Sequence, residues 1–178
     1  MTAQSPDLAT PAKWMSRLSG LFALLSAAGY LYIFLDPKLA LRVVSENALS
    51  NIPGEVGSLQ YVLLFIVGAV PVSLFIAALL SARRFFACYV SGQLFPGNSS
   101  AALSRMGKLF LALAILGPII RMVAVLVITW TNPPGQKQLT LSLSTSDGLL
   151  IVLSGLLLMV GHILAEANRL SEDNRQII

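Results

Sequence analysis

The sequence predicts an all-α membrane protein with four transmembrane helices and a small extracytoplasmic β cap. Four apolar stretches of 18 to 22 residues predict the helices, at 18–35, 61–80, 109–130 and 148–165. A helix that rises about 1.5 Å per residue needs roughly 20 residues to cross about 30 Å of hydrocarbon. Only 11% of the residues are charged, against about 25% in soluble domains. A polar/apolar alternation near residue 140 predicts the cap.

The domain organisation follows from the positions of these stretches. Residues 1–14 are polar and lack periodicity, so we expect a flexible cytoplasmic tail there. Residues 15–178 are expected to form a single four-helix membrane domain, because the chain leaves no room for a separate soluble domain.

Composition also limits the chemistry that we expect. The chain has one cysteine, Cys88, and one histidine, His162. These residues alone cannot form a disulfide, a structural zinc site or a two-histidine haem site. The net charge of +4 comes from basic residues near the ends of the apolar stretches, where they meet lipid headgroups. We therefore expect no cofactor, no metal, no direct contact with nucleic acid and no enzymatic activity.

The basic residues also predict the orientation, because cytoplasmic segments carry an excess of lysine and arginine. Eight lie on one side of the predicted membrane: Lys13, Arg17, Arg83, Arg84, Arg105, Lys108, Arg169 and Arg175. Three lie on the other: Lys38, Arg42 and Lys137. Both termini and the middle loop are therefore expected in the cytoplasm.

The first outer loop, residues 36–60, begins with a proline and contains the turn signal Pro53-Gly54. Within it, residues 39–45 fit either a short strand or a helical turn. The second outer segment alternates strictly between polar and apolar residues from Gln138 to Ser144, a pattern typical of a half-buried strand. Since a lone strand is unstable, we expect the two segments to pair as the β cap. An extended segment lying on the headgroups is the alternative.

The middle loop should prolong the second and third spans as helix beyond the membrane. The run Arg83-Arg84-Phe85-Phe86 continues the second span, and Gly92 is expected to end that helix. Asn98 or Ser99 can cap the next helix, because their side-chain oxygens accept hydrogen bonds from free backbone N–H groups.

The loop and the C-terminal part resemble the DUF2975 family of small four-span bacterial membrane proteins. The resemblance rests on the motifs Arg83-Arg84-Phe85-Phe86, Gly92-Gln93-Leu94-Phe95 with Asn98, Ser146-Asp147-Gly148-Leu149-Leu150, Gly155-Leu156-Leu157, and the run from Leu164 to Asn174. It covers roughly residues 60–178, with Arg175 where the family usually has a glutamate. It implies a four-helix membrane protein of unknown activity, and a soluble helix-turn-helix regulator as a partner because such regulators are often encoded beside relatives.

Arg121 is the only charged residue inside an apolar stretch. An arginine at the centre of a span costs about 2.5–3.5 kcal/mol on insertion scales, so it needs a reason to be there. We expect Ser154 at a similar depth and Asp147 within reach of the arginine. Arg121, Ser154 and Asp147 therefore form a candidate intramembrane polar site. It would either anchor an anionic ligand or fix the packing of the helices through Asp147, Ser154 or loop carbonyls.

A second candidate cluster lies on the predicted cytoplasmic face. His162 and Glu166 are four residues apart and share a helix face, so they are either a proton-sensitive pair or a helix-end contact to the middle loop. The other members are Arg83, Arg84, Arg105, Lys108, Glu172 and Asp173. Opposite charges predict an ion-pair cluster. The alternative is that the basic residues bind anionic lipid while the acidic tail stays free for a partner.

Small residues at helical spacing, Gly20, Ala23 and Ala27, predict close packing of the first span. This packing is either within the bundle or in a homodimer. Taken together, these patterns favour a regulatory or sensory scaffold that couples an outer cap to a cytoplasmic partner. A small transporter, or a transporter subunit working as a homo-oligomer, is the alternative function.

Overall fold

The computed structural model describes residues 9–48, 57–90, 97–132, 139 and 141–176, and these residues form five helices. They are α1 (Ala9–Leu35), α2 (Pro37–Ala48), α3 (Ser58–Val90), α4 (Gly97–Thr129) and α5 (Thr145–Gln176). The four long helices α1, α3, α4 and α5 are each long and apolar enough to cross a membrane. The four predicted spans therefore lie on four separate helices, and each helix extends beyond its predicted span.

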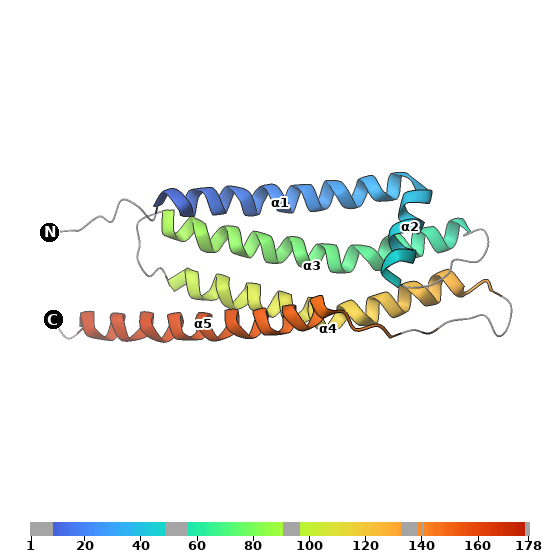
Figure 1. Cartoon of the computed structure of the whole chain (residues 1–178). Coiled ribbons are helices and arrows are strands. Elements are labelled where there is room, and N and C mark those ends of the chain that lie inside the picture. The colour runs from blue at the N-terminus through green and yellow to red at the C-terminus, as the bar shows by residue number, and fades with distance from the viewer. Residues whose placement is uncertain (1–8, 49–56, 91–96, 133–138, 140, 177–178) are drawn as a thin grey trace.

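The four long helices pack side by side in the order α1, α3, α4, α5 (Figure 1). Each has extensive contacts with its neighbour in this row, whereas α1 packs extensively on neither α4 nor α5. The bundle is therefore open. Large apolar side chains are exposed on the outermost helices, such as Leu24 at 72% on α1 and Met159 at 68% on α5. Such surfaces are expected where hydrocarbon replaces water as the solvent.

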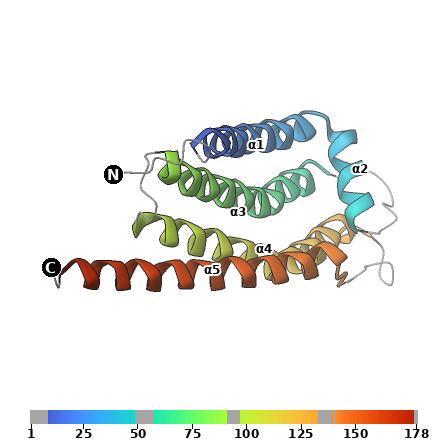
Figure 2. The same cartoon turned by 60° about the vertical axis from the view of Figure 1, so that its left-hand side comes forward.

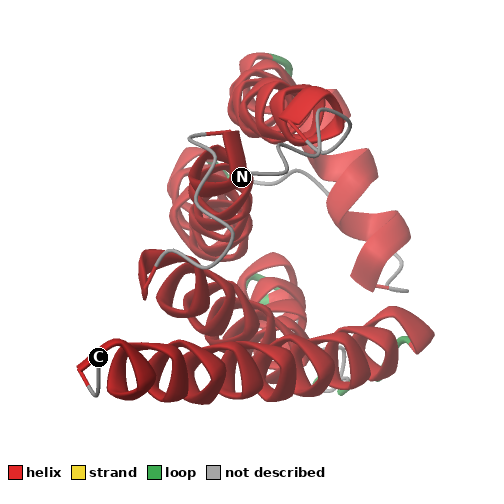
Figure 3. Ribbon diagram, turned by 90° about the vertical axis from the view of Figure 1, so that its left-hand side faces the viewer, coloured by secondary structure: helices red, strands yellow, loops and turns green. Residues whose placement is uncertain are grey.

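Helix α2 crosses one end of this row. It contacts both α1 and α4, and so bridges two helices that do not pack against each other (Figures 2 and 3). Its start has an N-terminal cap, because Asp36 Oδ1 accepts a hydrogen bond of 2.9 Å from the Lys38 N–H, and Pro37 occupies the first helical position. We call this end of the molecule the α2 end. The opposite end, where α1 begins and α5 ends, is the terminal end.

The predicted β cap is wrong for the residues that the structure describes, because they contain no strand. The helical alternative for residues 39–45 is correct, since they lie inside α2. Of the second predicted strand, residues 138 and 140 lie outside the described residues, and 139 and 141–144 have no regular secondary structure. The alternation there instead leaves Leu139, Leu141 and Leu143 exposed, at 62–79%, in a segment that leads into α5. A polar/apolar alternation with a period of two residues indicates an extended segment, but it does not show that a partner strand is available.

The limits of the predicted tail also change. Helix α1 begins at Ala9, so residues 9–14 are helical, and residues 1–8 lie outside the described part. In the middle loop, α3 continues to Val90 as predicted, and the predicted helix end at Gly92 lies outside the described residues. Helix α4 begins at Gly97, so Asn98 and Ser99 lie inside its first turn and the predicted capping by either residue is wrong.

Small residues allow α4 and α5 to approach closely. A Cβ added to Gly161 would lie 2.5 Å from Ser104 Oγ and 3.1 Å from Ser104 N. A Cβ added to Gly107 would lie 3.1 Å from the backbone of both Ser154 and Leu158. Helices in lipid associate through such close backbone packing, because lipid tails are as apolar as the helices themselves. The small residues of α1 face the bundle in the same way, since Ala23 is buried and Gly20 lies against the Arg83 side chain.

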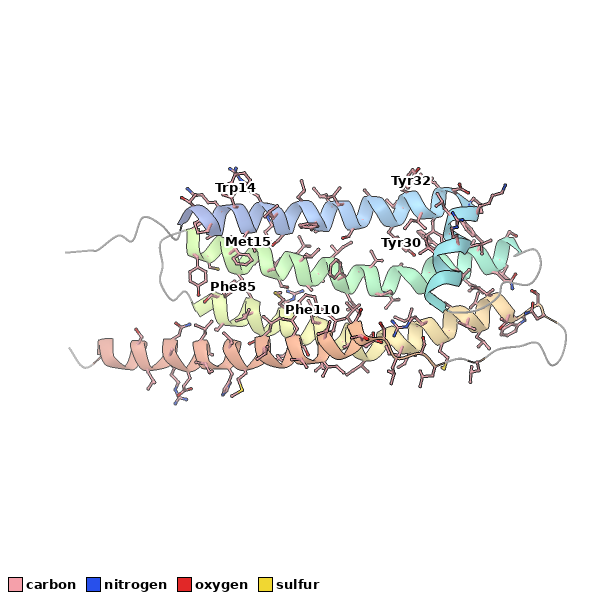
Figure 4. The ribbon with its side chains drawn as sticks, viewed as in Figure 1. Trp14, Met15, Tyr30, Tyr32, Phe85 and Phe110 are labelled. Carbon is pink, nitrogen blue, oxygen red and sulfur yellow. The ribbon has the colours of Figure 1, made fainter. Side chains whose placement is uncertain are left out.

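Aromatic residues join α1 to α3 near the α2 end. The Tyr30 hydroxyl donates to the Phe65 carbonyl, and the Tyr61 hydroxyl donates to the Phe34 carbonyl. The four rings lie in contact, with centroids 5.0–5.5 Å apart. Figure 4 shows Tyr30 directed towards α3 and Tyr32 directed away from the bundle. Tyr30 and Tyr61 therefore each donate a hydrogen bond to the backbone of the neighbouring helix.

Candidate functional site

Arg121 lies on α4 and joins that helix to the start of α5. Its Nη2 donates to Asp147 Oδ2 in an ion pair, and also to the Ser142 carbonyl at 3.1 Å. The Asp147 side chain is 8% exposed and that of Arg121 is 26% exposed, so the pair is largely shielded. This contact confirms that Asp147 is within reach of Arg121, and that Arg121 also binds a loop carbonyl.

Asp147 also caps α5. Its Oδ2 accepts a hydrogen bond of 2.8 Å from the Ser144 N–H, and Ser144 Oγ accepts one of 3.3 Å from the Ser146 N–H. Ser144 is therefore the N-cap of α5, and Asp147, the third helical residue, accepts from the Ser144 N–H as the acidic residue of a capping box does. The same carboxylate fixes the first turn of α5 and holds Arg121. The negative charge also lies at the positive end of the helix dipole, where it is favourable.

Gly117 leaves the space that this pair occupies. A Cβ at Gly117 would lie 3.4 Å from Asp147 Oδ1 and 3.7 Å from Arg121 Nη1. Pro118 follows and is buried, and it has no N–H to donate within the helix. The Gly117-Pro118 step therefore brings the α4 backbone close to the first turn of α5.

Ser154 does not belong to this site, and its predicted role beside Arg121 is wrong. Its Oγ donates to the Ile151 carbonyl at 2.7 Å within α5, and its own carbonyl lies beside Gly107. Gly107 precedes Arg121 on α4 by a distance of about 20 Å along the helix. Ser154, which lies beside Gly107, is therefore far from the level of Arg121. The prediction failed because depths counted from the ends of the apolar stretches do not fix the register between two helices.

An apolar cavity of about 350 Å³ lies beside Arg121 at the α2 end. Helix α3 lines it with Leu64, Val67, Gly68, Pro71 and Val72. Tyr30, Ile33 and Phe34 of α1, Ile120, Arg121 and Ala124 of α4, and Ala40 and Val43 of α2 complete the lining. Arg121 is the only charged residue in this lining, so the arginine is both paired with Asp147 and adjacent to an apolar space.

The predicted cluster at the terminal end is brought to one end of the molecule but is not joined by ion pairs. Arg83, Arg84, Arg105, Lys108, His162 and Glu166 are all exposed. Among the side chains that the structure describes, no ion pair joins Glu166 to the middle-loop arginines, and no hydrogen bond joins Glu166 to His162. The predicted ion-pair cluster is wrong to that extent. Charges in water gain about 0–1 kcal/mol from pairing, which is little to hold long side chains together.

Two acidic members of that cluster remain untested. Glu172 and Asp173 lie within the helical residues of α5, but their side chains are outside the described part. The Arg83 side chain instead lies along α1, with Nη1 3.4 Å from the Cβ position of Gly20, and the Ser16 hydroxyl donates to the Arg83 carbonyl at 3.4 Å.

Gln60 is a structural residue that the sequence did not single out. It is 7% exposed, and its Nε2 donates to the carbonyls of Val127 and Ile128 at 2.9 and 3.3 Å and to Thr131 Oγ1 at 3.2 Å. These carbonyls belong to the last turn of α4, which lacks helical N–H partners. A glutamine one residue before an apolar stretch was the available signal. Its partner could not be inferred, because it depends on the register between α3 and α4.

Comparisons with family models, with curated proteins and with solved structures find no match to this chain. The DUF2975 resemblance therefore stays a prediction. The fold and the site define the class of the protein: it is a helical multi-pass membrane protein with four candidate spans, in which a shielded Arg121–Asp147 pair joins the last two. Among the described residues, no group of three or more His, Cys, Asp or Glu side chains lies close enough to hold a metal ion.

Proposed function

We propose that the protein is a non-enzymatic regulatory or sensory scaffold that docks a soluble protein at its terminal end. One observation carries the proposal: the basic side chains of Arg83, Arg84, Arg105 and Lys108 are exposed, and the described residues do not neutralise them. Helices α3, α4 and α5 have 32–33 residues, so each is about 50 Å long and exceeds the hydrocarbon by about 20 Å. Part of this excess projects as a charged helical surface.

The location of the terminal end in the cytoplasm is part of the proposal. The excess of lysine and arginine at that end supports it. A bacterial inner membrane, the DUF2975 family and a helix-turn-helix regulator as the docked protein belong to the same proposal, and the sequence motifs support them. At the α2 end, α2 and the segment 141–144 take the place of the expected cap as the part that receives a signal.

The docking proposal is tested by purifying the protein from native membranes with its bound proteins. The variant Arg84→Glu/Arg105→Glu reverses two exposed charges of the terminal end, and Lys38→Glu reverses an exposed charge at the α2 end as the control. We expect one soluble protein to copurify with the wild type and the control, and its recovery to fall at least fivefold with the double variant. Equal recovery from all three preparations would exclude docking at this surface.

A small transporter, working as a homo-oligomer, is the second candidate function. The cavity beside Arg121 is the observation in its favour, because a charged residue in a cavity at membrane depth is common along substrate paths. The pairing of Arg121 with Asp147 favours the scaffold. The scaffold and the transporter are distinguished by measuring the flux of candidate substrates into proteoliposomes that contain the wild type or Arg121→Ala. The absence of flux with both proteins would exclude transport.

A further inference from the structure

The cavity between the helices has a construction that suits a particular kind of ligand. Helix α3 forms its floor, α1 and α4 form its walls, and α2 crosses over it through Ala40 and Val43. On this floor Gly68 lies against the Tyr30 side chain, because a Cβ there would lie 3.1 Å from the Tyr30 hydroxyl. At about 350 Å³ the cavity lies at the lower end of the usual range for ligand pockets, about 300–1,000 Å³.

The apolar lining excludes a polar or multiply charged ligand. Apart from Arg121, the polar atom of a lining side chain is the Tyr30 hydroxyl, which already donates to the Phe65 carbonyl. Water needs two to four polar partners to occupy a cavity, so a cavity of this kind is either empty or filled by an apolar molecule. In a chain whose outer helices face hydrocarbon, the bilayer itself is the nearest source of such a molecule.

Arg121 specifies the polar part of the ligand. Its Nη2 makes both observed contacts, Nε is enclosed without a partner, and Nη1 has no hydrogen bond to any described residue. A guanidinium has five N–H donors, and leaving buried donors unsatisfied costs free energy. Because Asp147 already neutralises the charge, a neutral acceptor such as a carbonyl oxygen fits better than a second carboxylate.

Polar groups reach the level of Arg121 from the segment before α5. Asp147 and its neighbours Ser142, Ser144, Thr145 and Ser146 lie at the start of that helix, before its apolar stretch. Ester carbonyls of phospholipids lie in the polar layer that borders the hydrocarbon. A lipid ester can therefore reach Arg121 beside the start of α5.

We propose that this cavity holds one acyl chain of a membrane phospholipid, with an ester carbonyl oxygen of that lipid accepting a hydrogen bond from Arg121. The site binds its lipid specifically, unlike the exposed faces of α1 and α5, because three helices and α2 surround the chain. The proposal does not depend on the docking of a soluble protein at the terminal end.

The test uses the full-length protein in vesicles of phosphatidylethanolamine and phosphatidylglycerol that contain a trace of phosphatidylglycerol with a diazirine in one acyl chain. After irradiation, mass spectrometry locates the lipid adducts on the chain. Val67 lines the cavity, and Leu24, which is 72% exposed on α1, reports general contact with lipid. We expect adducts at both residues, and unlabelled phospholipid in excess should lower labelling at Val67 more than labelling at Leu24.

Two comparisons make the test specific. Ala124→Phe fills the cavity and should lower labelling of Val67 at least fivefold, whereas Ala28→Phe, on an exposed face of α1, should leave it within twofold of the wild type. On the wild-type protein, an ether-linked probe, which lacks the ester carbonyl, should label Val67 several-fold less than the ester probe.

Four results would overturn the proposal. The first is the absence of adducts at Val67 in the wild type. The second is equal labelling of Val67 by the ether and ester probes. The third is displacement of the ester probe by free fatty acid as readily as by phospholipid. The fourth is unchanged labelling in folded Ala124→Phe. If that variant fails to fold, Val72→Phe fills the same cavity from α3.

Discussion

Substitution of Gly161 by alanine should separate α4 from α5. The added Cβ would lie 2.5 Å from Ser104 Oγ and 3.1 Å from Ser104 N, whereas ordinary contacts begin at about 3.4 Å. The hydroxyl can rotate away, but the backbone nitrogen can move only with its helix. Overpacking of this kind typically costs about 1–3 kcal/mol. The gain in helix propensity from Gly to Ala, about 1 kcal/mol, acts in the opposite direction.

Gly155→Ala is the matched control, because Gly155 lies on the same helix and nothing would lie within 4 Å of its Cβ. Both variants gain the same helix propensity, so the difference between them isolates the packing cost. We expect Gly161→Ala to be less stable than Gly155→Ala by about 1–3 kcal/mol. At about 2–4 °C per kcal/mol, this is a difference of roughly 2–12 °C in Tm, measured by thermal unfolding in a mild detergent.

A third variant identifies the atom responsible. In a Ser104→Ala background the hydroxyl is gone, so the cost of Gly161→Ala should fall but not vanish, because the contact with the backbone nitrogen remains. If Gly161→Ala melts at or above the Tm of Gly155→Ala, the close contact between α4 and α5 is not present in the protein, and the reasoning is refuted.

Three further predictions follow from the other contacts. Arg121→Met should lower stability by about 3–5 kcal/mol by leaving Asp147 unpaired, and adding Asp147→Asn should restore much of the loss; equal Tm values for the single and double variants would count against the ion pair. Gln60→Leu should cost about 1–3 kcal/mol and speed hydrogen exchange in the last turn of α4; unchanged exchange there would contradict the capping role. In a cysteine-free background, a membrane-impermeant maleimide should label Lys38→Cys but not Lys13→Cys in intact cells, and the reverse pattern would invert the proposed orientation.

The sequence predicted the helices well because each span depends on local composition alone. Four apolar stretches became α1, α3, α4 and α5, and Asp147 was correctly expected near Arg121. What failed depended on contacts between distant segments. The alternation at 138–144 does not encode whether a partner strand exists, and Ser154 was placed at the wrong level because the register of α4 and α5 depends on the packing of Gly107 and Gly161.

The α2 helix shows a further limit of local patterns. Its N-terminal signal, Asp36-Pro37, was present in the sequence, but residues 39–45 fitted a strand as well as a helical turn. The cavity under α2 could not be foreseen, because it depends on α1 and α4 packing on the same helix without packing on each other.

The Arg121–Asp147 pair has a consequence for how the chain enters the membrane. The two residues are 26 positions apart, so during synthesis α4 is complete before the carboxylate of α5 has left the ribosome. An unpaired arginine within a span costs about 2.5–3.5 kcal/mol on insertion scales, and the pair removes that penalty only when both helices are present. This order favours insertion of α4 and α5 together as a helical hairpin, with the third span held at the translocon until the fourth arrives.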